Sequence, residues 1–138
     1  QHSTLYKIMN KILVEVSVGE LLDKITILEI KKEKIKDNES LKFINDEYNI
    51  LKGEFDKNIK FDEKLKKLFN SLKDINSKLW SIEDEKRMCE KNSDFGDLFI
   101  KISREIHFLN DERSKVKLEI NSYTGSKIRE IKKYTNYS

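Results

Sequence analysis

Apolar side chains recur at alternating intervals of three and four residues along most of this 138-residue chain. The runs are clearest at residues 41–55, 65–82 and 102–120. Such spacing puts the apolar side chains on one face of a helix, and it is typical of long helices that cross as in left-handed coiled coils. The chain has no proline and only four glycines, so it is poor in helix-breaking residues. We therefore expect an all-α fold, an antiparallel bundle of long coiled-coil-like helices.

The apolar runs and the short polar stretches between them define the expected helices. These helices span residues 18–37, 39–57, 62–91 and 94–123. A short closing helix is indicated by Ile128, Ile131 and Tyr134. The helix over 62–91 would be about 45 Å long. That length exceeds the needs of a compact four-helix domain and suggests a protruding hairpin or a dimer.

The segment before the first helix has a different pattern. From Ile12 to Val18, apolar residues alternate with other side chains, which predicts a short N-terminal β-strand or extended segment. No second strand is evident, so the segment would pair with its symmetry copy in a homodimer or lie extended along the helices. Ser17 and Glu20 have the spacing of a capping box, which explains Glu20 as part of a helix start.

Length and charge limit the class of protein. We expect a single helical domain over residues 9–138, with residues 1–8 an artificial or disordered tail. The net charge is only +3 with no one-sided basic stripe, which argues against nucleic-acid binding. No apolar run approaches the roughly 20 residues of a membrane span. One cysteine, Cys89, and no signal-peptide pattern predict a cytoplasmic protein, and no metal site or cofactor is predicted.

Charged residues interrupt the most apolar helix. Asp23, Lys24 and Glu29 lie among the leucines and isoleucines of residues 21–30. Glu29 falls within the main apolar arc of the helix, where a charge needs a partner. The simplest interpretation is an edge ion pair between Glu29 and Lys32; the alternative is that the three charges belong to a binding site.

A second charge interrupts the last long helix. Arg113 occupies a position of the apolar seam, with Asn110 one turn before it. A guanidinium there requires acidic partners or a ligand anion, and the sequence leaves both possibilities open: a buried salt bridge to Glu29 or Glu83, or a ligand site. Arg87, four residues after Glu83, would lie on the same face of the neighbouring helix. Nearby Trp80 is expected in the core.

These polar clusters resemble motifs of a small uncharacterised bacterial and phage family of unknown function. The matching residues are Val14-Glu15-Val16-Ser17, Gly19-Glu20-Leu21, Asp23 to Lys31, Leu79-Trp80, Ile82-Glu83-Asp84, Asn110 to Arg113, Lys117 and Ile120-Asn121. The resemblance implies a helical domain without an established activity and a loose association with glycan biosynthesis.

Two functions follow from these observations. The first is a non-catalytic helical interaction or assembly module. We expect it to be a homodimer, and a second protein is a further possible partner. The alternative is a small enzyme or binding protein for an anionic metabolite, with Arg, Lys and Glu side chains between helices. The ligand-binding candidates are Asp23, Lys24, Glu29, Glu83, Arg87, Asn110 and Arg113.

Overall fold

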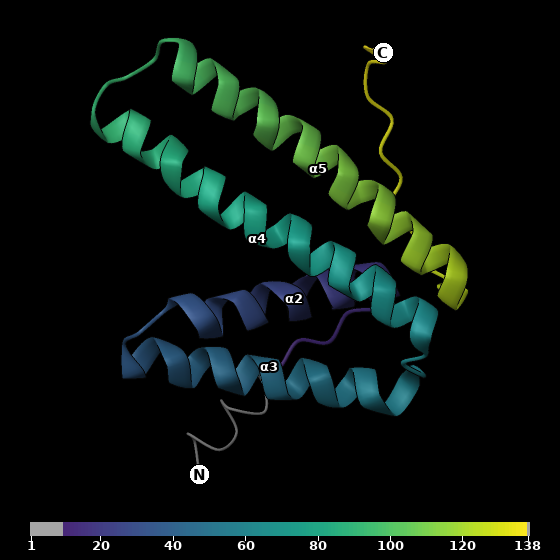
Figure 1. Ribbon diagram of the computed structural model, residues 1–138. Coiled ribbons are helices and arrows are strands. Elements are labelled where there is room, and N and C mark those ends of the chain that lie inside the picture. Colours follow the sequence, from purple (N-terminus) through teal and green to yellow (C-terminus); the bar gives the residue numbers. More distant parts are fainter. Residues whose placement is uncertain (1–9, 138) are drawn as a thin grey trace.

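The computed structural model describes residues 10–137 and contains four α-helices and no β-strand in that range. In chain order the helices are α2 (Val18–Lys34), α3 (Asn38–Asn58), α4 (Glu63–Lys91) and α5 (Asp97–Thr124) (Figure 1). The all-α prediction is confirmed, and each helix bound lies within three residues of its predicted position. The tail expected at residues 1–8 lies outside the described residues.

Successive helices run in opposite directions and are joined by short connections (Figure 1). The central helix is α2, which packs against each of the other three. Helices α4 and α5 lie side by side over most of their length and form the most extensive helix pair. The coiled-coil-like geometry that the spacing suggests stays a prediction.

Polar caps determine where the helices begin. The side chains of Ser17, Asp37 and Asp62 accept hydrogen bonds from the backbone N–H three residues on, at 3.1, 2.9 and 2.9 Å. Such caps satisfy donors that a helix start leaves free. The predicted first helix ends early, at Lys34, because Ile35 and Asp37 take extended backbone so that Asp37 can cap α3.

The apolar side chains form two adjoining cores. The first joins all four helices and includes Leu22 and Ile25 of α2, Phe55 of α3, Leu72 of α4 and Ile120 of α5. The second lies between α4 and α5 alone and contains six buried residues: Ile75, Leu79, Ile82, Cys89, Ile102 and Ile106. The distal half of the α4–α5 hairpin therefore projects beyond α2 and α3 and is held by its own core (Figure 1).

Two local expectations differ from the structure. The strand predicted from Ile12 to Val18 is absent, since residues 11–17 belong to no helix or strand, Val18 begins α2, and the described chain offers no second strand for pairing; the alternative of an extended segment stays a prediction. Residues 126–137 do not form a closing helix, and Ile131 and Tyr134 are exposed. A helix of that length is marginal without an apolar surface to cover it. Among residues 10–137, no helix combines the length and apolar character that crossing a membrane requires.

Candidate functional site

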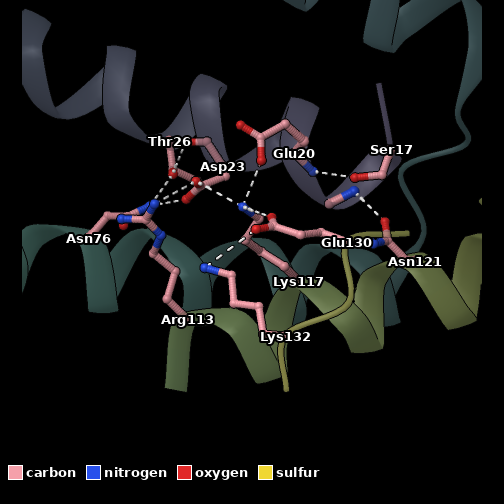
Figure 2. A network of polar contacts seen from close by, with 11 residues as sticks. Ser17, Glu20, Asp23, Thr26, Asn76, Arg113, Lys117, Asn121, Glu130 and Lys132 are labelled. Atoms are coloured by element: carbon pink, nitrogen blue, oxygen red, sulfur yellow. Dashed lines mark hydrogen bonds and ion pairs between the residues drawn. The ribbon is translucent and has the colours of Figure 1, made fainter. Parts of the chain in front are cut away.

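A buried carboxylate lies at the point where α2, α4 and α5 meet. The side chain of Asp23, on α2, is only 3% exposed. Its Oδ2 lies 3.4 Å from Nη2 of Arg113 and 3.5 Å from Nζ of Lys117, both on α5. Figure 2 shows these two cations rising from α5 toward the carboxylate. A carboxylate removed from water needs such partners to remain charged.

An amide and a hydroxyl complete the surroundings of Asp23. Nδ2 of Asn76, on α4, donates to Asp23 Oδ1 and to Thr26 Oγ1, both at 2.8 Å. The Thr26 hydroxyl donates in turn to the Asp23 carbonyl oxygen at 2.7 Å. Asn76 and Thr26 are buried, and their hydrogen bonds tie α4 to α2 without adding charge.

Lys117 connects this buried carboxylate to the start of α2. Its side chain is 12% exposed, and Nζ lies 2.7 Å from Glu20 Oε2. The hydrogen bond from Lys117 outweighs the effect of burial and lowers the pKa of the Glu20 carboxyl below its usual range. The predicted cap is confirmed in its first half, because Glu20 N–H donates to Ser17 Oγ, but the Glu20 carboxylate contacts a helix 97 residues away.

The first turn of α2 is also held by the end of α5. The Gly19 N–H donates to Asn121 Oδ1 at 2.7 Å, and the Val18 N–H donates to Ser126 Oγ at 3.2 Å. These bonds satisfy backbone donors that would otherwise be free at a helix start. Glu130, in the segment after α5, lies at the edge of these contacts, with Oε2 3.9 Å from Lys117 Nζ and Oε1 3.5 Å from Lys132 Nζ (Figure 2).

Charges within the network balance. Asp23 and Glu20 face Arg113 and Lys117, two negative groups against two positive groups. We define these four residues with Thr26, Asn76 and Asn121 as the interhelical network. Because its charges are internally compensated, the interhelical network mainly positions three helices, and Arg113 is the more exposed of its two cations, at 32% against 12% for Lys117.

A groove of about 430 Å³ borders the interhelical network, and its polar side chains at Glu83, Arg87 and Asn110 are exposed to solvent. It lies between α2, α4 and α5 and is lined by Ile27, Ile30, Asn76, Leu79, Trp80, Glu83, Asp84, Arg87, Asn110 and Arg113. Four predicted candidates meet here: Glu83, Arg87, Asn110 and Arg113. No hydrogen bond or ion pair within residues 10–137 engages the side chain of Glu83, Arg87 or Asn110. Trp80 is half-buried along the groove, so its expected place in the core is wrong.

Two other candidates do not reach the groove. Glu29 faces α3 and α4, where its carboxylate lies 3.1 Å from Lys73 Nζ and accepts from the Tyr48 hydroxyl at 3.3 Å. The expected pair with Lys32 is absent from the described ion pairs, and Lys32 Nζ lies 4.0 Å from the centre of the Tyr48 ring. Lys24 is exposed on the outer side of α2. Arg113 also departs from expectation, because its partner is Asp23 and neither of the expected glutamates.

Asn76, Lys117 and Asn121 are not among the candidates that the sequence suggests, although Lys117 and Asn121 belong to the motifs that carry the family resemblance. A signal for two of them was present: Arg113, Lys117 and Asn121 follow one another at intervals of four, which places three polar groups on one face of α5. Asn76 had no comparable signal, since it follows Ile75 within a seam whose exact inward face depends on packing.

Among the described residues, no three His, Cys, Asp or Glu side chains are grouped as a metal site would require. Fold and site together define a class of protein: small all-α domains in which a buried polar network joins three helices beside an open groove. The chain belongs to DUF6165, a family of unknown function whose model matches residues 12–137. The expected membership of an uncharacterised helical family is confirmed. No curated protein and no solved structure matches the chain.

Proposed function

We propose that this protein is a binding module for a small anionic metabolite, held in the groove between α2, α4 and α5. One observation carries the proposal: Glu83, Arg87 and Asn110 line one groove with no partner among the described residues. Polar side chains that converge on a concave surface without satisfying one another are available to a ligand. The proposal is one of binding and assigns no reaction.

Arg113 is the residue best placed to hold an anion. Its guanidinium has five N–H donors, and within residues 10–137 its one ion pair is the 3.4 Å contact with Asp23. The side chain is 32% exposed and lines the groove, so donors remain for a carboxylate or phosphate. The ion pair with Asp23 holds the Arg113 guanidinium in place, which reduces the conformational entropy lost when a ligand binds.

The other lining groups favour a ligand with a ring and hydroxyl groups. Trp80 offers an indole surface for stacking, and Glu83, Asp84 and Asn110 offer oxygens that accept hydrogen bonds. Two acidic and two basic residues line the groove, so a purely anionic ligand would meet repulsion. Phosphosugars and sugar nucleotides combine the required groups, which agrees with the expected association with glycan biosynthesis. Dicarboxylates carry negative charge without a ring or sugar hydroxyl groups, so they test whether an anionic group is sufficient for binding.

A thermal-shift screen with these three ligand classes tests the proposal. Arg87→Met is the informative variant, because Arg87 makes no ion pair or hydrogen bond within residues 10–137, so its replacement should not disturb the fold. Arg104→Met is the matched control, an exposed arginine on α5 outside the groove. We expect a ligand to raise the Tm of wild type and Arg104→Met and to raise that of Arg87→Met much less. The proposal fails if no ligand shifts wild type, or if all three proteins shift equally.

A second candidate function is a homodimeric assembly module. The observation that favours it is a run of exposed apolar side chains before α2, at Ile12, Leu13, Val14 and Val16. Light scattering over a range of protein concentrations tests it, and a monomer throughout would count against it. We also propose a cytoplasmic location; its support is that the chain has one cysteine, Cys89, which is buried and in no disulfide.

A further inference from the structure

The chain immediately before α2 is apolar and uncovered. Ile12, Leu13, Val14 and Val16 are 83, 81, 74 and 45% exposed. No backbone hydrogen bond in the described chain joins residues 11–16 to another segment. In Figure 1 these residues run from the start of α2 without helical turns. Single exposed apolar residues are ordinary, whereas four within five positions form a contiguous patch that marks an interaction site.

Both sides of this segment are exposed, which excludes the alternative that it lies along the helices. Ile12 and Val14 would project from one face of an extended chain and Leu13 from the other, yet all three are more than 70% exposed. The unpaired N–H and C=O groups of such a segment are a template for pairing with another extended chain. Pairing would satisfy these groups and cover the apolar side chains together.

We propose that residues 11–15 of two copies pair as an antiparallel β-ribbon about a two-fold axis at Leu13. This inference deepens the homodimer candidate and is independent of the ligand groove. The pairing is isologous, so the numbers of any two residues that lie opposite each other add up to the same sum. Opposite residues point to the same face of the ribbon, and along each strand odd-numbered and even-numbered residues point to different faces. Each pair therefore joins two odd or two even positions, the sum is even, and the two-fold axis passes between two copies of the same residue.

Charge complementarity selects the axis at Leu13. That register puts Lys11 opposite Glu15 of the partner subunit, twice by symmetry, and Ile12 opposite Val14 of the partner subunit, also twice. An axis at Val14 would put Leu13 opposite the partner's Glu15, and an axis at Ile12 would put Lys11 opposite the partner's Leu13. Only the Leu13 register places charge against opposite charge and apolar against apolar.

Sedimentation equilibrium of the complete chain gives the first test. A two-stranded ribbon is marginally stable, so we expect a concentration-dependent dimer. Glu15→Lys opposes lysines on both sides of the axis and should weaken association about tenfold. The double variant Lys11→Glu/Glu15→Lys restores both pairs and should restore association. Residues 11 and 15 are exposed, so circular dichroism should report the same helix content in every variant.

Symmetric cross-linking tests the register itself. Opposite residues of an antiparallel pair have Cα atoms about 4.5–5.5 Å apart, within disulfide range, while diagonal neighbours are about 7–8 Å apart and outside it. Leu13→Cys should therefore form a disulfide-linked dimer on mild oxidation, and Val14→Cys should not. The native Cys89 is buried and does not interfere. A monomer at every concentration, a dimer unaffected by Glu15→Lys, or equal cross-linking at positions 13 and 14 would each overturn the proposal.

Discussion

Gly19 and Asn121 hold the start of α2 against the end of α5 at a distance that admits no larger residue. The Gly19 N–H donates to Asn121 Oδ1 at 2.7 Å. A Cβ on Gly19 would lie 2.6 Å from the Lys117 carbonyl oxygen and 2.9 Å from Asn121 Oδ1. Because the closer atom belongs to backbone, a helix must move to relieve the clash. Glycine is required here by close approach rather than by a special φ angle.

Gly19→Ala should therefore destabilise the protein by about 1–3 kcal/mol, as overpacking of a tight contact does. Gly53→Ala is the matched control, since it lies within α3 and a Cβ there meets nothing within 4 Å. Alanine should stabilise that position by about 0.5–1 kcal/mol. Urea denaturation of both variants measures the free energy of unfolding. Equal effects in the two variants would show that α2 and α5 do not cross this closely.

The buried carboxylate of Asp23 gives a second prediction. Asp23→Ala leaves Arg113 and Lys117 without their shared anion and should cost about 3 kcal/mol of unfolding free energy. A double-mutant cycle with Lys117→Met should give a coupling of about 1–3 kcal/mol. The exposed pair Asp74–Lys78 is the control, at 3.2 Å with side chains 66 and 62% exposed, and Asp74→Ala should cost less than about 1 kcal/mol. Additive effects of Asp23→Ala and Lys117→Met would contradict the interhelical network.

The partner of Arg113 marks the limit of what the sequence could predict. The 3–4 spacing locates the helices because each repeat adds to the same periodic signal. The same spacing shows that Arg113 replaces an apolar residue and needs a polar partner. It does not show which face of α2 meets α5, because α2 packs against three helices and has apolar residues on several faces. The sequence suggests Glu29 or Glu83 as the partner of Arg113, whereas Glu29 faces Lys73 and Arg113 contacts Asp23.

The role of the Glu20 carboxylate could not be predicted for a related reason. The predicted helix cap is present, since the Glu20 backbone N–H donates to Ser17 Oγ, but the cap does not involve the Glu20 side chain. A capping motif is read from neighbouring residues, whereas the contact with Lys117 depends on how two distant helices cross. The groove was more predictable, since Glu83 and Arg87 share a helix face and Asn110 and Arg113 lie one turn apart.

The lowered pKa of Glu20 predicts how acid affects stability. The hydrogen bond and charge of Lys117 favour the ionised carboxylate in the folded state, so the folded protein binds a proton less readily than the unfolded chain. The resulting stabilisation is fully present above the unfolded pKa of about 4.5 and is lost as pH falls through the lower folded pKa. Glu20→Gln removes this dependence.

Unfolding free energies of wild type and Glu20→Gln between pH 7 and pH 3 measure the effect. The difference between the two proteins should be constant above pH 5 and should shrink below about 4.5. The carboxyls of Asp37 and Asp62 also have lowered pKa values, because Asp37 accepts hydrogen bonds from Ser40 and Asp62 accepts one from Tyr123. Wild type therefore loses further stability in acid. Those groups are common to both proteins and cancel in the comparison. A difference that grows on acidification would contradict the Glu20–Lys117 contact.

The two cores predict that the distal α4–α5 hairpin opens without the rest of the protein. Cys89 lies in the second core, 4% exposed, and burial raises the pKa of its thiol, with Asp94 and Glu85 adding to the rise. Since the thiolate is the reactive form, native labelling at pH 7 should be slow and should require opening. Only α4 and α5 supply this core, so opening need not disturb α2 or α3.

Labelling kinetics of two variants separate local from global opening. Ile102→Val trims the second core, costs about 0.5–1.5 kcal/mol, and should speed Cys89 labelling roughly 2- to 10-fold. Gly19→Ala weakens the crossing of α2 and α5 near the first core and should leave the labelling rate nearly unchanged, although it lowers global stability. If labelling accelerated equally in the two variants, Cys89 would be reached only by global unfolding, and the two cores would form one cooperative unit.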